Sequence, residues 1–263
     1  SNHGINSDSI DLLQYNGYVM SGTIDDFNNF GTFVISNDMS DSANYSVVKN
    51  WLDIENFSDY FAIETWSENG DWLQNNVRYW RERKAGAKWR HILWDLDFFG
   101  TGWWPFTANS LDTNMKKISG DKISYQSILF TTLVQNTEFR EYFINRYADL
   151  INTLLHKDNL KKFANAIRDS IDPEMPRQFK RWGWGYNNPA FGNSGNGSYD
   201  TWRLDNFNQL IYFINNRNIT ARNHIQQVFN LKQQVPLTLT VYPPGAGTIQ
   251  INTVQPDSFP WGG

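Results

Sequence analysis

The chain has 263 residues, no Cys, a formal net charge of −4 and an aromatic content of 16% that includes 12 Trp. This length allows one large or two small domains with an ample core, and the negative charge argues against nucleic acid as a partner. Without Cys, neither a disulfide framework nor a thiolate zinc site can form. No apolar run approaches the roughly 20 residues that a membrane span needs.

The first fifty residues give little sign of a nucleotide-binding lobe. They contain no Gly-rich phosphate loop, and their one Lys, Lys49, lies in an expected helix. We interpret residues 1–9 as a leader or an expression remnant.

Acidic and amide residues between positions 71 and 97 occur in an order that indicates a function. Asp71 stands five positions before Asn76, and the alternating segment 89–93 predicts a strand that ends before Asp95 and Asp97. The catalytic half of a protein kinase has the same chain order: first a base Asp, then a metal-binding Asn, then a strand that ends in a metal-binding Asp. These residues hold the metal that neutralises the charge of the nucleotide phosphates. Taken alone, Asp-x-x-x-x-Asn also occurs in surface loops, where such residues cap helices or form Asx-turns.

The segment between these motifs is basic, and Lys84–Lys88 is typical of a hairpin turn between two strands. Its cations either face phosphates or an acidic substrate, or keep an exposed hairpin soluble. They are Arg78, Arg81, Arg83, Lys84, Lys88 and Arg90.

The second half is predicted to be helical. Apolar residues spaced three or four apart favour helices over 127–134, 138–155, 159–171, 202–216 and 221–229, with Pro173 ending the third. We interpret these stripes as core. His91 is expected to hydrogen-bond within the core, and His156 and His224 to lie at helix ends or on the surface.

A loop rich in Gly, Asn and aromatic residues separates these helices, over 181–199. Its Trp182, Trp184 and Tyr186 either stack on a sugar or a peptide, or fasten the loop to the domain.

The last segment changes character. Residues 235–252 alternate with period two around a Pro-Gly turn, which predicts a two-stranded hairpin. An isolated hairpin is marginal in water, so it either begins a following β-domain or packs back on the main domain.

The motifs resemble the spore-coat protein H (CotH) kinase family of atypical, secreted kinases, over about residues 10 to 230. The segments that carry the resemblance are 53–61, 69–72, Asn75-Asn76, 79–81, 88–97 and Phe99-Gly100.

This resemblance implies transfer of a phosphoryl group from ATP to a protein hydroxyl by a secreted or cell-surface bacterial protein. It implies Asp71 as the catalytic residue, and Asn76 and Asp95 as ligands of Mg²⁺ with its ATP. Asp97 is the alternative for the second metal role, and Asn75 the alternative to Asn76.

The implied fold is mainly α with a small β-hairpin region (α+β): a kinase-like carboxyl-terminal lobe over 10–232, then the start of a β-domain over 233–263. Family members carry a strand-rich nucleotide-clamping lobe with a phosphate-binding Lys before the matching region. We expect that this chain does not include that lobe, and therefore that it is inactive alone. The alternative function is a non-catalytic extracellular glycan- or protein-binding module. Two-carboxylate glycoside hydrolysis is a weaker idea: Glu64 and Glu68 precede Asp71, but no spacing demands it.

Overall fold

A computed structural model describes residues 4–73, 75–99, 105–116, 124–182 and 198–263. The chain divides into two compact units, one of residues 1–96 and 110–144, the other of residues 97–109 and 145–263. Each unit is described by itself.

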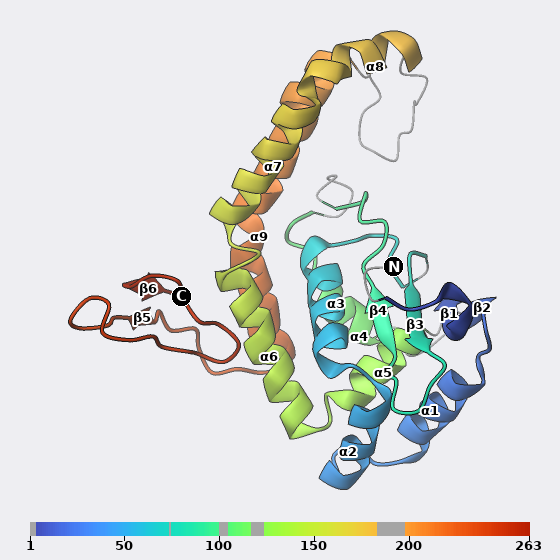
Figure 1. Cartoon of the computed structure of the whole chain (residues 1–263). Helices are drawn as coiled ribbons and strands as arrows, with labels where there is room; N and C mark the ends of the chain where they lie inside the picture. Colours follow the sequence, from blue (N-terminus) through green and yellow to red (C-terminus); the bar gives the residue numbers. More distant parts are fainter. Residues whose placement is uncertain (1–3, 74, 100–104, 117–123, 183–197) are drawn as a thin grey trace. The chain divides into compact units, whose positions relative to one another are not determined.

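The first unit holds an antiparallel sheet of strand order β2-β1-β3-β4 (Figure 1). The strands are β1 (Ile10–Gln14), β2 (Tyr18–Ser21), β3 (Arg78–Glu82) and β4 (Arg90–Ile92). The β3–β4 hairpin confirms the predicted turn over 84–88. Strands β1 and β2 were not predicted, because Asp11 is buried inside β1 and interrupts its apolar pattern.

Helices pack around this sheet, and α3 contacts β4 directly (Figure 1). They are α1 (Asp25–Ser36), α2 (Ser42–Trp51), α3 (Ile54–Ser67), α4 (Ser110–Lys116), α5 (Tyr125–Leu133) and the first half of α6 (Thr137–Asn152). Lys49 lies in α2, as predicted. Helix α3 is capped by Asp53, whose side chain accepts a hydrogen bond from the Asn56 amide.

Aromatic side chains form the core of the first unit. Phe61 of α3 stacks on Phe130 of α5, with ring centroids 3.8 Å apart and an interplanar angle of 4°. Phe143 of α6 meets the Phe130 ring edge-on at 4.7 Å. Helix α3 is therefore buried on most of its circumference, and its polar residues must find partners inside the protein.

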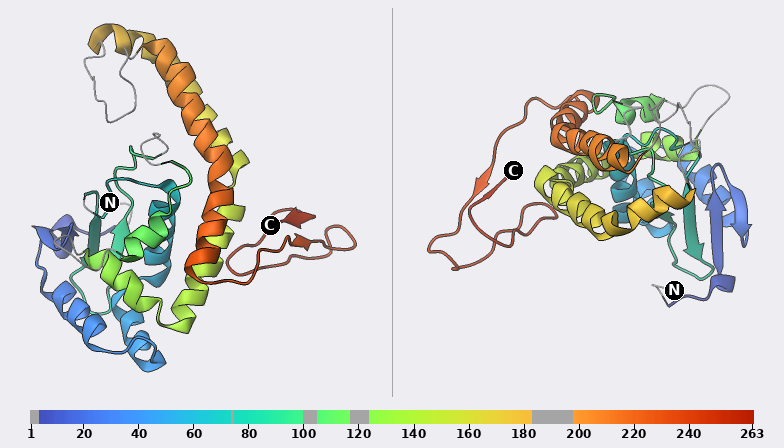
Figure 2. Two further views of the ribbon diagram at one scale, coloured as in Figure 1. Left: turned by 180° about the vertical axis from the view of Figure 1, so that it is seen from behind. Right: turned by 90° about the horizontal axis from the view of Figure 1, so that it is seen from above.

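The second unit is built on two helices that lie side by side, α7 and α9 (Figures 1 and 2). Its elements after α6 are α7 (Lys157–Ile171), a 3₁₀ turn (Asp172–Glu174), α8 (Met175–Trp182), a π-helical turn (Thr201–Asn206), α9 (Phe207–Val228), β5 (Thr238–Leu239) and β6 (Trp261–Gly262).

Two helix predictions need correction. The expected helices 202–216 and 221–229 are not separated: a π-helical turn (Thr201–Asn206) leads into α9, which runs unbroken from Phe207 to Val228 because residues 217–220 contain neither Gly nor Pro. Helix α7 does end at Ile171, but Pro173 occupies the first turn of a 3₁₀ helix, where its missing N–H costs nothing, and the chain stays helical to Trp182.

The predicted carboxyl-terminal hairpin is also wrong in its pairing. Strand β5 pairs with β6, with Thr238 opposite Gly262, and residues 247–250 form no strand. The carboxylate of Asp149 on α6 accepts hydrogen bonds from the Thr253 amide (2.9 Å) and hydroxyl (2.7 Å). The alternating pattern of residues 235–252 predicts strand pairing, but hydrogen bonds from Thr253 to the Asp149 side chain hold this part of the chain instead.

The chain is mainly α with a small antiparallel sheet, as predicted. Among the helices that the structure describes, none has the length and hydrophobicity to span a membrane.

Candidate catalytic site

The candidate site is formed by two connections of the first unit. One is the loop that leaves α3 and enters β3, and the other is the turn that follows β4. Because β3 and β4 are hydrogen-bonded neighbours, with Arg78 opposite Ile92, the start of β3 and the end of β4 lie at the same edge of the sheet. Residues before Arg78 and after Ile92 are thereby brought together.

Asn76 joins the two acidic motifs. Its Nδ2 donates to Asp71 Oδ1 at 2.8 Å and to the backbone carbonyl oxygen of Asp95 at 3.3 Å. Asn75 makes only a longer hydrogen bond to Asp71, at 3.4 Å, and is exposed. The geometry therefore favours Asn76 over Asn75 as the central amide.

Backbone strain is concentrated in the same place. Leu73, Asn76 and Asp95 have φ values of +70°, +59° and +57°, and Glu68, which ends α3, has +54°. Non-Gly residues in this region cost about 1 to 3 kcal/mol each, and they persist where the surrounding structure holds them, often at functional sites.

Two Trp residues flank the cluster in different ways. Trp72 is buried, donates from Nε1 to the Tyr60 hydroxyl at 2.7 Å and meets the Phe61 ring edge-on. Trp94 is 44% exposed and lies under the Arg78 guanidinium, whose central carbon is 3.8 Å from the ring centroid. Trp72 thus anchors the Asp71 loop in the core, and Arg78 presents a cation beside the Asp95 turn.

The sequence did not predict a buried polar layer beneath the loop. Glu64 is fully buried on α3, and its Oε2 accepts a hydrogen bond of 2.9 Å from Asn69 Nδ2, which also approaches the Asp95 carbonyl oxygen at 3.4 Å. Burial, reinforced by the nearby Asp71 charge, raises the pKa of Glu64 to about 8. The sequence feature that could have predicted the burial of Glu64 is its position on the apolar face of α3.

His91 lies in the core, as predicted. Its Nε2 is 2.7 Å from Gln126 Oε1, and its ring stacks on Tyr60 at 4.9 Å. Burial lowers its pKa to about 4, so the ring is neutral at physiological pH. His156 caps α7, as predicted, whereas His224 is buried within α9, which corrects the expectation of a helix-end or surface position.

Most cations of the basic segment have local partners. Arg81 pairs with Asp26 at 2.7 Å and with Asp11 at 3.2 Å, and Arg90 pairs with Asp53 at 2.8 Å. Lys84 pairs with Glu82, and Arg83 donates to the Asp8 carbonyl. These pairs favour the structural interpretation of the segment over phosphate binding.

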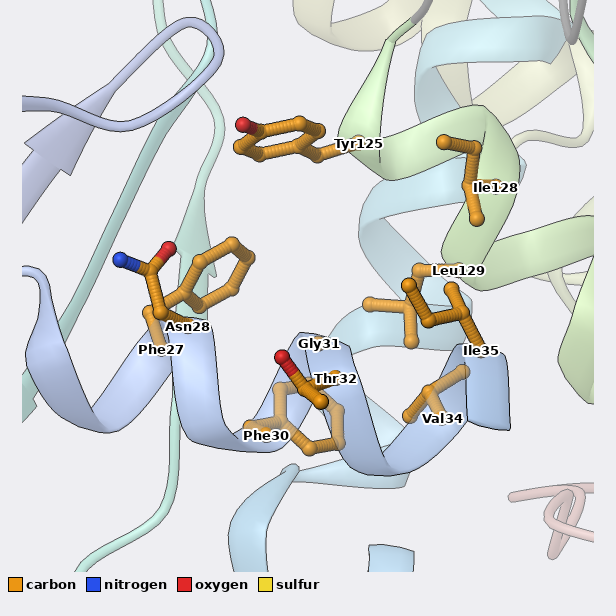
Figure 3. Close-up of a pocket in the computed structure, with 10 residues that line it drawn as sticks. All are labelled: Phe27, Asn28, Phe30, Gly31, Thr32, Val34, Ile35, Tyr125, Ile128 and Leu129. Atoms are coloured by element: carbon orange, nitrogen blue, oxygen red, sulfur yellow. The ribbon is translucent and has the colours of Figure 1, made fainter. Parts of the chain in front are cut away.

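An apolar groove of about 220 Å³ lies between α1 and α5 (Figure 3). Of the predicted site residues that the structure describes, none lines it. Its lining residues are Phe27, Asn28, Phe30, Gly31, Thr32, Val34, Ile35, Tyr125, Ile128 and Leu129.

The other predicted site residues stay predictions. Asp97 is exposed and belongs to the second unit. Trp182 is the last residue of α8, and Trp184 and Tyr186 lie outside the described residues. The ligand-stacking role of the aromatic loop therefore stays a prediction.

The donor set can be compared with what a metal needs. Mg²⁺ is usually held by one or two carboxylates, with phosphate and water oxygens completing the shell. The site offers the carboxylates of Asp71 and Asp95 and the amide oxygen of Asn76. Among the residues that the structure describes, no three or more His, Cys, Asp or Glu side chains converge. These hard oxygens fit Mg²⁺ that arrives with a nucleotide, and they do not form a complete protein cage.

A model of the CotH kinase protein family matches residues 7–220 of the chain. No curated protein and no solved structure matches it.

Proposed function

Because this chain belongs to the CotH kinase family, we propose that it contributes the catalytic centre for transfer of the ATP γ-phosphoryl group to a protein hydroxyl. In this proposal Asp71 orients the acceptor hydroxyl and takes its proton, and Asn76 and Asp95 hold Mg²⁺. The bound Mg²⁺ would neutralise charge on the phosphates.

One observation carries the proposal. The Asn76 amide donates to both the Asp71 carboxylate and the Asp95 carbonyl oxygen, so one side chain joins two motifs that are separated in the sequence. Asn76 Nδ2 is used by these two hydrogen bonds, which leaves its Oδ1 for a cation. Phosphoryl transfer depends mainly on such positioning and on charge stabilisation.

Arg78 supports the same assignment. It is the one cation of the basic segment that stacks on an aromatic ring next to Asp95. A guanidinium held over a ring can still donate in its own plane, which suits a phosphate oxygen.

The test is titration of Mg²⁺–ATP into the protein, with and without an upstream nucleotide-clamping lobe of the kind the family carries. Binding that is lost in Asp95→Ala supports the proposal. The matched control is Asp25→Ala, which removes an exposed Asp from α1 and is expected to leave affinity unchanged. Equal affinity in the wild type and Asp95→Ala, or no binding to either form of the protein, would contradict the proposal.

A further inference from the structure

A buried acid and a buried amide lie beneath the candidate site with complementary atoms left over. Asn69 Nδ2 donates to Glu64 Oε2 at 2.9 Å. Glu64 Oε1 and Asn69 Oδ1 are both buried, and neither has a hydrogen-bond partner among the residues that the structure describes. Two unsatisfied buried acceptors in one pair are costly, so the arrangement calls for one more donor.

We propose that Glu64 is a positioning residue of the candidate site: as a neutral carboxylic acid it pairs with the Asn69 side-chain amide, and this pair holds the Asp95 carbonyl oxygen in place. A proton on Oε1 supplies the donor that Asn69 Oδ1 lacks. Within the pair, the acid and the amide then each donate one hydrogen bond and accept one. The inference rests on the proposed function for its catalytic meaning, but not for the pairing itself.

The surroundings of Glu64 favour its neutral form. Glu64 is 0% exposed, and no basic side chain bonds it in the described part of the chain. The titratable groups that act on it electrostatically are Tyr60, one turn earlier on α3, and Asp71, whose negative charge disfavours a second one nearby. The neighbouring Glu68 is also an acid. Among the described residues, only the Asn69 amide hydrogen bond would compensate a carboxylate at this position.

The pair acts on the candidate site through one carbonyl. Asn69 Nδ2 approaches the Asp95 carbonyl oxygen at 3.4 Å, and Asn76 Nδ2 approaches the same oxygen at 3.3 Å. Asp95 itself has a φ of +57°, which a non-Gly residue keeps only when its surroundings hold it. The buried pair fixes the amide plane of Asn69, and Asn69 helps to hold the strained turn at Asp95, the residue that the proposed function makes a ligand of Mg²⁺.

The experiment compares variants by two readouts. The first is Mn²⁺ affinity with and without ATP, and the second is the carboxyl carbon shift of ¹³C-labelled Glu as the pH is raised. Glu64→Gln keeps a donor for Asn69 Oδ1 and should retain wild-type Mn²⁺ affinity. Glu64→Leu removes the pair and should weaken binding about ten- to hundredfold, as loss of a supporting residue around a metal does. Glu55→Gln, an exposed position on the same helix, is the matched control.

If Glu64→Leu does not fold, Asn69→Asp takes its place, because it keeps the size of the side chain and removes the donor to Asp95. Rescue by Gln, together with a Glu64 carboxyl that stays protonated at pH 6, supports the proposal. An ionised Glu64 at pH 6, or equal loss in Gln and Leu variants, overturns it. A wild type that binds no Mn²⁺ even with the upstream nucleotide-clamping lobe present defeats the proposed function, while the carboxyl shift still decides whether Glu64 and Asn69 form the neutral pair.

Discussion

At the scale of single residues, Asp71 carries the proposed proton transfer. In the protein with the upstream nucleotide-clamping lobe present, we expect Asp71→Asn to lower phosphoryl transfer by about 10²- to 10⁴-fold, the usual contribution of a general base. The Asn side chain can still accept the hydrogen bond from Asn76, so the fold and nucleotide affinity should be retained. Radiolabelled ATP with single-turnover kinetics measures the first effect, and calorimetry measures the second. Unchanged transfer would remove Asp71 from the mechanism.

Glu64 makes a prediction about pH and stability. Its folded pKa of about 8 lies above the ordinary value of 4.5, so the folded state holds a proton that the unfolded state has released. Its contribution is therefore complete below pH 4.5 and is lost as the pH rises to 8, at about 1.4 kcal/mol per pH unit. Denaturant unfolding across this range should show the loss in the wild type. Glu64→Gln should lack it, and Glu55→Gln should retain it.

His91 gives the opposite sign. Burial lowers its folded pKa to about 4, below the ordinary value of 6.5, so the unfolded state binds the proton more readily. Stability from this group is present above pH 6.5 and is lost as the pH falls to 4. Between pH 4.5 and 6.5 the contributions of Glu64 and His91 oppose each other. In Glu64→Gln, the His91 contribution is uncovered, and the first unit should become less stable with each step of acidification below pH 6.5.

At the scale of elements, Gly→Ala substitutions at two positions of the first unit should have opposite effects on stability, because one Gly lies in a helix and the other in a turn. Gly31 lies inside α1 and faces open space, because a Cβ added there would have no atom within 4 Å. Gly31→Ala should therefore stabilise the protein by about 0.5 to 1 kcal/mol. Thermal unfolding measures the gain in stability. A loss of stability would contradict the prediction and would show that the added methyl group disturbs the groove that Gly31 lines.

Gly22 is the contrasting position, in the connection that follows β2. It has a φ of +74°, and an added Cβ would lie 2.7 Å from the Ile10 carbonyl oxygen and would also collide with the Asp11 side chain. Asp11 is the buried partner of Arg81, so Gly22→Ala should destabilise the β1–β3 pairing by more than Gly31→Ala stabilises α1. The same unfolding measurement compares the two.

At the scale of the whole molecule, the carboxyl-terminal segment belongs to the second compact unit and is held there by Asp149 of α6. Asp149 is buried and accepts hydrogen bonds from Thr253 and, at 3.3 Å, from Asn252. Asp149→Ala should release residues 233–263 from α6 and make them sensitive to limited proteolysis, because an unanchored segment without long strands is an easy substrate. The first unit should resist digestion as before. Whether this segment begins a further β-domain stays a prediction.

The sequence by itself determined the local features: the helical character of the second half, though not every helix boundary, the β3–β4 hairpin, and the order of Asp71, Asn76 and Asp95 along the chain. These follow from periodicity, turn chemistry and motif spacing, which depend on neighbours in sequence. Only the tertiary structure decided which amide bridges the acids, because Asn75 and Asn76 differ by one position in a strained loop.

Only the tertiary structure, likewise, revealed strands β1 and β2 and the Glu64–Asn69 pair. Strand β1 pairs with β3 across more than sixty residues, and its buried Asp11 is stable because Arg81 lies opposite it. Glu64 is buried because α3 is surrounded on most sides. Neither a distant partner nor the depth of a helix face leaves a periodic signal, since both depend on contacts between segments that are far apart in the chain.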